Sequence, residues 1–358
     1  MESVIRRLRG LSCERLTEAE LGTALSRTLT PWVGHDAFRV AGLDPATGLG
    51  SFGFSHRYPL DLLWAQVHNI HLGDDPHGAA SLTRRPVPMG VLGQGKAGAA
   101  LQAGEILVRH GVGSDLRILL RDAGGAWGLV GLLREEGGRP FDAEDGERLL
   151  RLTPALIGVL RAYVQTGRLQ PPRPALPPGV IVVGADNTVR GISAQARAWL
   201  TELYARSGRP PDWAAHALVQ EAALAARAAG APGGAPGGAP GGAPGGAPGG
   251  HALTCVPSAF CGRWVATQAQ LTGPDGAGDV TVVVQAPPPR LLLPTLAAWY
   301  AITAREREVV DHLCTGAALR QIARRMDVSL HTVNAHLKAV YRKTATTGRE
   351  ELTAALMG

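Results

Sequence analysis

Near the carboxyl end of the chain, residues 302–344 place core-type side chains at helical spacing three times in succession. Thr303 followed by Glu306 has the spacing of a capping box and opens the first helix. Gly316 ends it, because glycine tolerates the left-handed conformation at a helix terminus. The pattern predicts three short amphipathic helices with tight breaks between them. Their expected buried faces are Val309, Val310 and Leu313; Leu319, Ile322, Ala323 and Met326; and Val333, His336, Leu337 and Val340.

Positive charge is concentrated on the second and third of these helices. Between Leu319 and Lys343 there are six Lys or Arg residues and one acid, Asp327. Ser329 closes the intervening turn and is placed to cap the third helix. A stripe of one sign is typical of a nucleic-acid binder, because neutralised phosphates release counterions. The alternative interpretation is a three-helix bundle with a solvated basic face.

The same stretch resembles the LuxR/FixJ-type helix-turn-helix family of DNA-binding domains. The positions that match the family's spacing are Thr303, Arg305, Glu306, Glu308, Val309, Gly316, Ile322, Ala323, Ser329, Thr332, Val333, His336, Leu337, Lys343, Arg349 and Leu352. In that family the helix after Ser329 enters the major groove, and the helix before it crosses the DNA backbone. The resemblance therefore implies a recognition helix at 330–344 in an all-α four-helix domain.

The resemblance also implies roles for individual side chains. Base-edge contacts are implied for Asn334, Ala335 and Lys338. Asn334 stands where the family commonly has Lys, which removes a charge but adds a side chain able to pair bidentately with adenine. Phosphate contacts, which position the domain without reading sequence, are implied for Arg320, Gln321, His331, Thr332, Arg342 and Lys343.

Two departures from the family pattern affect stability. Ala318 stands where the family usually has a Ser or Thr N-cap, a loss of about 0.5–2 kcal/mol. Ala345, Thr346 and Gly348 replace the family's Gly, Val and Ser. We expect these replacements to loosen the packing of the last helix, 349–357, which in the family often forms the dimer seam.

The whole chain has the composition of a nucleic-acid-binding protein with several domains. Its 358 residues, 45% of them apolar, leave room for two or three cores, and the net charge of +6 suits a DNA partner. No apolar run approaches the length of a membrane helix, and the amino terminus lacks the apolar segment of a secretory signal. We expect a cytoplasmic protein without membrane contact. The scattered cysteines predict buried free thiols, with a Cys255–Cys261 redox pair as the alternative.

Proline and glycine divide the chain into segments. Residues 231–250 are five tandem Ala-Pro-Gly-Gly units, which cannot bury a core and are expected to be a disordered insertion. The composition predicts a sensor domain, a Pro-rich linker, a second sensor domain, a short linker and the DNA-binding domain, over 1–170, 171–178, 179–286, 287–292 and 293–358.

Residues 1–170 are predicted to form an α+β domain. We expect hairpins at 37–43 with 49–55 and at 115–122 with 126–135, and helices before Pro31, over 60–72 and over 142–165. The order of elements, with the segments DPATGL and GAWGLVGLLRE, resembles the GAF-like domains that precede LuxR-type readers. The glycine-rich residues 90–99 lack P-loop spacing and are expected to be a loop. A phosphoacceptor domain is disfavoured, since the first strand brings no acidic pair.

One cluster in this region invites a metal hypothesis. His68, His71 and His77, with Asp74 and Asp75, are residue types that ligate metals. The favoured alternative is a polar loop around Pro76. We therefore predict no metal site and no cofactor.

Residues 179–286 resemble a PAS-like sensor fold. The evidence is a hairpin at 179–193 around Asp186-Asn187, a helix at 194–204, and strands at 263–271 and 279–286. A module that packs and dimerises without a cofactor is favoured, with a small-molecule cavity as the alternative.

These expectations combine into one prediction. The fold is α+β, with GAF-like and PAS-like sensor domains followed by an all-α LuxR-type helix-turn-helix domain. The function is sequence-specific transcriptional regulation by a homodimer bound to double-stranded DNA, with a small-molecule effector as a candidate further partner. A scaffold with a degraded DNA-binding head is the alternative. An enzyme with a regulatory head is disfavoured, because no nucleophile, base and orienting group can be assigned.

Overall fold

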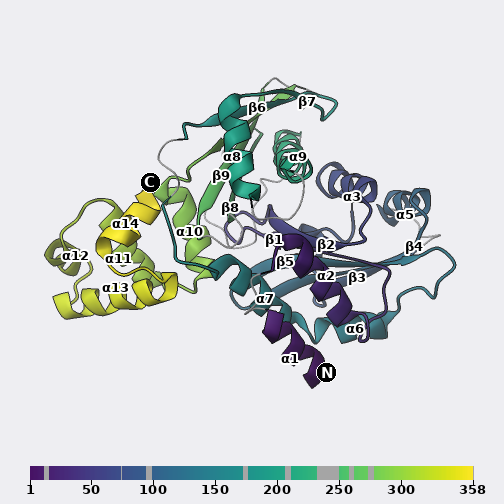
Figure 1. Ribbon diagram of the computed structural model, residues 1–358, viewed down its shortest axis with the longest axis horizontal. Coiled ribbons are helices and arrows are strands. Elements are labelled where there is room, and N and C mark those ends of the chain that lie inside the picture. The colour runs from purple at the N-terminus through teal and green to yellow at the C-terminus, as the bar shows by residue number, and fades with distance from the viewer. Residues whose placement is uncertain are drawn as a thin grey trace.

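The computed structural model describes residues 1–11, 16–73, 75–93, 99–171, 176–205, 211–231, 250–257, 262–272 and 278–357. Within them the chain forms two antiparallel five-stranded sheets and a carboxyl-terminal group of helices (Figure 1). The expected disordered insertion lies outside the described residues apart from Ala231 and Gly250. Asp74, Cys13 and Cys261 also lie outside them.

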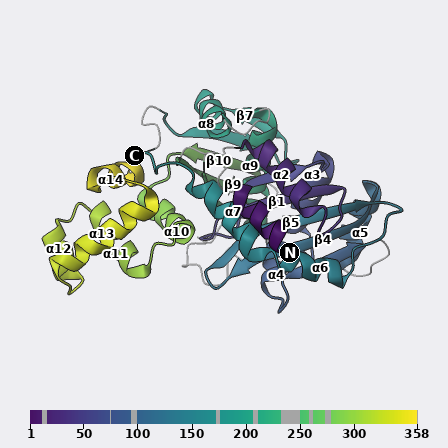
Figure 2. The same cartoon turned by 60° about the horizontal axis from the view of Figure 1, so that its bottom comes forward.

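The first sheet has the strand order β2-β1-β5-β4-β3. Its strands are β1 (Ala37–Leu43), β2 (Gly50–His56), β3 (Met89–Gly93), β4 (Val112–Asp122) and β5 (Gly125–Glu135). One face is covered by α1 (Glu2–Leu11), α2 (Glu18–Leu29), α6 (Ala143–Leu150) and α7 (Thr153–Gln165). The other face is covered by α3 (Leu60–Leu72), α4 (Ala79–Thr83) and α5 (Ala99–Arg109). Both views show α3 and α5 on the side of the sheet away from α7 (Figure 1, Figure 2). Both predicted hairpins and the helix at 60–72 are confirmed.

Two expectations for this region are wrong. The helix predicted at 142–165 is broken at Arg151-Leu152, between α6 and α7. Pro154 explains the break, because proline lacks an N–H and its ring clashes with the carbonyl four residues earlier in a continuous helix. The loop predicted at 90–99 begins instead as β3, which pairs with β4 at the sheet edge.

The second sheet has the order β7-β6-β10-β9-β8, which is the order of the first sheet counted within its own five strands. Its strands are β6 (Gly179–Val183), β7 (Val189–Ile192), β8 (His251–Pro257), β9 (Trp264–Thr272) and β10 (Asp279–Gln285). Helices α8 (Ala194–Tyr204) and α9 (Pro211–Gly230) pack on it. The hairpin turn places Asn187 in the left-handed region, at φ 59°. The assignment of the two sheets to GAF-like and PAS-like families stays a prediction.

The carboxyl-terminal helices are α10 (Pro289–Trp299), α11 (Ala304–Cys314), α12 (Leu319–Arg325), α13 (Leu330–Thr344) and α14 (Arg349–Met357). Residues 289–292, expected to be part of a linker, are the first turn of α10. Pro289 can start this helix because the first helical amides need no intrahelical acceptor. Leu292 and Leu293 are buried, which explains why the segment is ordered rather than extended.

The three parts of the molecule meet at a buried carboxylate in the β1–β2 turn. Asp44 Oδ2 accepts from the Cys255 amide of β8 at 2.8 Å, and Oδ1 accepts from the Thr295 hydroxyl of α10 at 2.7 Å. Asp44 is 1% exposed. Beside it, Trp299 of α10 packs against Trp127 of β5, with ring centroids 5.0 Å apart. One continuous apolar cluster therefore runs from the core of the first sheet into the carboxyl-terminal helices.

Candidate DNA-binding surface

Helices α12 and α13 are joined by a tight turn with defined capping. Asp327 has φ 52°, and the Val328 amide donates to the Ala323 carbonyl at 3.0 Å, which closes the end of α12. Ser329 Oγ accepts from the Thr332 amide at 3.0 Å and caps α13. The predicted helices, their turn and the Ser329 cap are confirmed, as is the left-handed Gly316 at φ 79°.

The cap at the start of α12 is incomplete. Ala318 has the extended backbone of an N-cap residue but no side-chain acceptor. The reverse half of a capping box is present, since Gln321 Oε1 accepts from the Ala318 amide at 3.1 Å. The expected weakness at Ala318 is therefore partly offset by Gln321, which also stands in the predicted phosphate-contacting set.

The inner face of α13 is anchored in the core of the helical domain. Val333, Leu337 and Val340 are fully buried, whereas His336, predicted to be buried with them, is only half-buried. An inner face held by several buried side chains fixes how α13 is rotated about its axis. That rotation decides which side chains face solvent.

The outer face of α13 presents His331, Ala335, Lys338 and Arg342 to solvent, with Asn334 half-buried beside them. Arg320 and Gln321 of α12 are exposed, and Thr332 is half-buried with its hydroxyl 2.9 Å from that of Ser329. The sequence reasoning did not assign roles to Arg324 and Arg325, which are also exposed on α12. Among the described residues, no acid pairs with any of the basic side chains at positions 320, 324, 325, 338 or 342.

Lys343 differs from the other predicted phosphate contacts. Its ammonium donates to the Ala301 carbonyl and to Glu306 Oε2, each at 2.6 Å. Burial alone would raise the pKa of Glu306, but the hydrogen bonds from Lys343 and from the Thr303 amide outweigh it and lower that pKa. Lys343 therefore ties α13 to the start of α11 and is not free to reach a phosphate.

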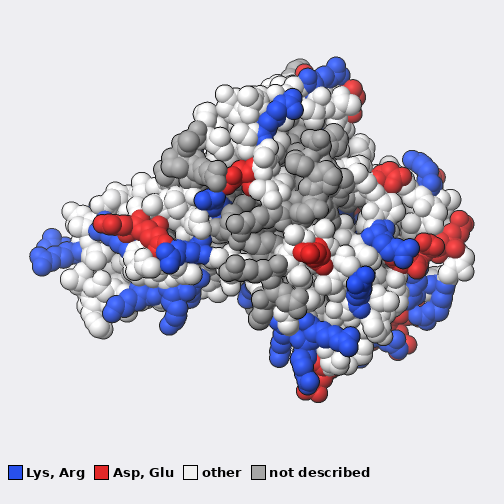
Figure 3. Space-filling model, in the orientation of Figure 1, with Lys and Arg blue, Asp and Glu red and all other residues white. Residues whose placement is uncertain are grey.

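Two acidic side chains of this domain are paired with basic neighbours on α11. Glu308 and Asp311 form ion pairs along α11 with Arg305 and Arg307. In the space-filling view, blue side chains gather along the lower rim of the domain, where α13 runs (Figure 3). The field in front of α13 is consequently positive, which suits a polyanion.

The last helix, α14, is packed inward despite the replacements that precede it. Leu352, Ala355 and Leu356 are buried, and Thr346 is 6% exposed. Glu351 pairs with Arg168, just after α7, at 2.9 Å. The expected loosening of α14 is not observed. On one side, α14 is therefore held by the segment that follows α7.

Two residues of the metal hypothesis have other partners in the structure, and Asp74 lies outside the described residues. Asp75 binds Arg117 at 3.0 Å, and His71 binds Glu221 at 3.1 Å, so both are engaged within the protein. Within the described ranges, no three His, Cys, Asp or Glu side chains gather as a metal site. Cys255 is buried, and Cys261, its partner in the alternative redox pair, lies outside those ranges. None of the described helices is long and apolar enough to span a bilayer.

A capped helix pair with a fixed, unpaired basic outer face defines a helix-turn-helix DNA-binding domain. Residues 301–356 match the family described as bacterial regulatory proteins, luxR family, and the chain thus carries a LuxR-family domain of a DNA-binding transcriptional regulator. The chain is also 45% identical over 51 residues to the monoamine regulon transcriptional regulator of Klebsiella aerogenes. That similarity covers 14% of this chain and 22% of the relative, well under two thirds of its length.

Proposed function

We propose that the protein is a sequence-specific transcriptional regulator that binds double-stranded DNA as a homodimer under the control of its two sheet-containing parts. The observation that carries the proposal is the outer face of α13, whose basic side chains are exposed and unpaired among the described residues. A cationic face without internal partners is available to phosphates, and α13 at 15 residues is about 22 Å long, enough to lie in a major groove.

In this proposal the side chains have two roles. Ala335 and Lys338 of the exposed face contact base edges, together with Asn334, which is half-buried beside them. The phosphate contacts are Arg320, Gln321, His331, Thr332 and Arg342. Arg324 and Arg325 extend the phosphate set along α12, whereas Lys343 is left out because Glu306 holds it.

A homodimer is proposed because one recognition helix reads few base pairs. Two heads on half-sites about 34 Å apart would combine their contacts and read a palindromic site. Control of DNA binding by the sheet-containing parts is supported by α10, which contacts both the first sheet and the helical domain. Gln165 Nε2 of α7 donates to the Trp299 carbonyl at 2.7 Å. A shift of α7 relative to the helical domain would therefore move the end of α10, where that domain begins.

The test is selection of genomic DNA fragments by the full-length protein at about 50 and 200 mM salt, followed by sequencing. We expect enriched palindromic sites. Lys338→Ala should change which sites are enriched, and Arg342→Ala should weaken all sites alike and lower the salt dependence. Arg305→Ala is the matched control, since Arg305 is exposed on α11 and paired with Glu308. Salt-sensitive binding without enrichment would instead favour a degraded DNA-binding head. If neither Lys338→Ala nor Arg342→Ala changes DNA binding, the proposal that α13 is the recognition helix is refuted.

A further inference from the structure

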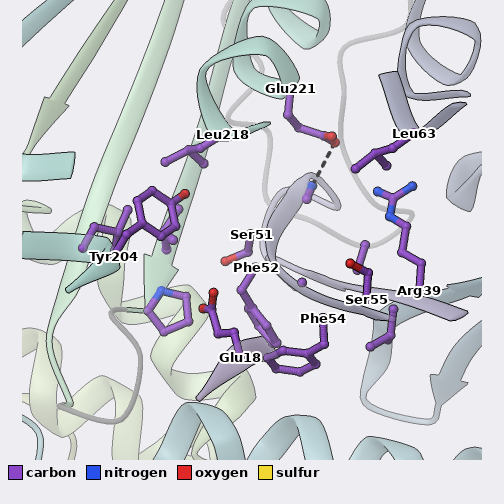
Figure 4. A pocket seen from close by; sticks show the side chains of 17 residues that line it. Glu18, Arg39, Ser51, Phe52, Phe54, Ser55, Leu63, Tyr204, Leu218 and Glu221 are labelled. Atoms are coloured by element: carbon purple, nitrogen blue, oxygen red, sulfur yellow. Dashed lines mark hydrogen bonds between the residues drawn. The ribbon is translucent and has the colours of Figure 1, made fainter. Parts of the chain in front are cut away.

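A cavity lies at the β2 edge of the first sheet, where β1 and β2 meet α3, α8, α9 and β8. The register between β1 and β2 divides its lining between the two faces of the sheet. Phe52 and Phe54 lie on the face covered by α7, and Arg39 lies on the opposite face. Figure 4 shows Arg39 and Glu221 on one side of β2 and the two phenyl rings on the other. A small ligand beside Arg39 therefore does not touch the phenyl rings.

The part of the cavity beside Arg39 has a floor of small residues and apolar walls. Ala41 and Gly53 are paired across β1 and β2 on the same face as Arg39. Leu63 of α3 and Leu218 of α9 supply the walls. The whole cavity has a volume of about 110 Å³. One water needs about 10–15 Å³, so a ligand confined to this part has at most roughly ten non-hydrogen atoms.

One cation in this part of the cavity has no acceptor. Arg39 of β1 is half-buried, and no described residue accepts a hydrogen bond from its guanidinium. Desolvation lowers the pKa of Arg39, the direction expected for a cation moved from water without a bound anion. Its neighbour Arg117, by contrast, is paired with both Asp75 and Asp115. The guanidinium of Arg39 is therefore available to a ligand.

One carboxylate in the same part of the cavity has a free oxygen. Glu221 Oε1 accepts from His71 Nε2 at 3.1 Å and from the Gly50 amide at 3.3 Å, whereas no described residue donates to Oε2. Burial alone would raise the pKa of Glu221, but the hydrogen bond from His71 and the positive charge of Arg39 outweigh it and lower that pKa. Glu221 is therefore ionised at neutral pH, and its Oε2 can accept a further hydrogen bond.

The charges of Arg39 and Glu221 influence each other but form no ion pair. Each favours the charged form of the other, and neither is the other's ion-pair partner. Charges that leave water without a partner are costly, so both side chains favour a ligand that restores a partner. A lone carboxylate would leave Glu221 without a cation, and a lone amine would leave Arg39 without an anion. A zwitterion supplies both partners at once.

We propose that this part of the cavity binds a small aliphatic α-amino acid, its carboxylate held by Arg39, its ammonium by Glu221 Oε2 and its side chain packed on Leu63 and Leu218. The planar guanidinium matches a carboxylate with two parallel hydrogen bonds. Leu218 and Glu221 are three residues apart on α9 and share one face of that helix, so the apolar wall adjoins the ammonium site. The small floor leaves room for the backbone atoms of the ligand.

The site joins two parts of the molecule. Arg39 belongs to the first sheet, whereas Glu221 belongs to α9, which packs on the second sheet. A bound amino acid would therefore hold α9 against β1. The contact between the two parts continues through the Ser51 hydroxyl of β2, which donates to the Cys255 carbonyl of β8 at 2.6 Å. Control of DNA binding through this contact rests on the proposed function, whereas amino-acid binding does not.

The test is isothermal titration of the full-length protein with L-valine, 3-methylbutanoate and 2-methylpropylamine. The second probe is valine without its ammonium, and the third is valine without its carboxylate. We expect L-valine to bind at least about tenfold more tightly than either, because each deletion removes a charge-assisted contact. Absence of L-valine binding by the wild type, or equal affinity for L-valine and either of the other probes, would overturn the proposal without reference to a variant.

Variants then assign the two charges. Arg39→Met should weaken L-valine binding about tenfold or more without weakening 2-methylpropylamine, which has no carboxylate. Glu221→Gln should weaken L-valine binding similarly without weakening 3-methylbutanoate, which has no ammonium. Ala41→Leu keeps both charges but fills the floor, and it should abolish L-valine binding. Arg27→Met is the control, since Arg27 is exposed on α2 and does not line the cavity.

This crossed pattern separates a direct contact from a structural effect. A variant that only disturbs the fold weakens all three probes alike, and that result for Arg39→Met and Glu221→Gln would overturn their roles. An equal loss of L-valine affinity in Arg27→Met would do the same. DNA affinity is then measured with and without L-valine. Binding of L-valine by a protein that does not bind DNA would refute the proposed function and leave the amino-acid site standing.

Discussion

Replacing Lys343 with methionine separates an internal anchor from a DNA contact. The substitution removes two hydrogen bonds from the Lys343 ammonium, to the Ala301 carbonyl and to Glu306 Oε2. The side chains are 22% and 8% exposed for Lys343 and Glu306, so the pair is neither fully screened nor fully desolvated. Hydrogen bonds to charged groups contribute about 1.5–3 kcal/mol, whereas exposed pairs contribute up to about 1 kcal/mol. We expect Lys343→Met to lower the free energy of unfolding by about 1.5–3 kcal/mol.

The measurement is urea unfolding of the full-length protein, with Arg342→Met as the matched control. Arg342 is exposed and has no partner among the described residues, so its replacement should change stability by less than about 0.5 kcal/mol. In the DNA assay, Arg342→Met should have a larger effect than Lys343→Met. Arg342→Met should reduce the slope of log affinity against log salt by about 0.9 for each copy of Arg342 in the proposed homodimer, and Lys343→Met should leave the slope unchanged. A normal unfolding midpoint with a reduced slope in Lys343→Met would refute the anchor.

The pH dependence gives this prediction a second check. The pKa of Glu306 in the folded protein lies below its ordinary value of 4.5, so the pair's stabilisation is complete above that value. It is lost as the pH falls through the folded-state pKa. The difference in stability between wild type and Lys343→Met should therefore be full at neutral pH and shrink in acid. A difference that stays constant down to strongly acidic pH would contradict an ion pair.

Two further predictions concern the cap of α12 and the buried carboxylate. Ala318→Ser should raise stability by about 0.5–2 kcal/mol in urea unfolding without changing the DNA salt slope, because position 318 already has an N-cap backbone and Gln321 supplies the reverse bond. Asp44→Ala should lower stability by about 1–3 kcal/mol for each buried donor left without an acceptor. The donors are the Thr295 hydroxyl and the Cys255 and Ala46 amides, and the substitution should also increase cleavage in limited proteolysis. Burial raises the pKa of Asp44, so its contribution is lost as the pH rises through the folded-state pKa, and Asp44→Asn should abolish that part of the pH dependence.

Local signals in the sequence predicted the elements that have their own turns and caps. The helix at 194–204 and the hairpin before it have the expected bounds, because Ser193 and Asn187 act on neighbouring residues. β3 and β8 were missed, since each is an edge strand of its sheet and is defined by a partner strand elsewhere in the sequence. The strand at Met89–Gly93 contains two glycines, and such a segment is hard to tell from a loop by composition.

The same limit applies to the functional residues. The exposure of Lys338 and Arg342 follows from helical periodicity, which the sequence displays directly. The anchoring of Lys343 does not, because Glu306 is 37 residues away and reaches it only after α11 and α13 pack.

Helix α10 affects how cooperatively the protein unfolds. Trp299 and Leu292 belong to an apolar cluster that includes both Phe54 of the first sheet and Val309 of the head. Melting the head would strip one side of that cluster, so heating should produce a single shared transition for the head and the first sheet. The LuxR-family match begins at residue 301, just beyond α10. The segment that matches the LuxR family is therefore shorter than the segment that we expect to unfold as one cooperative unit.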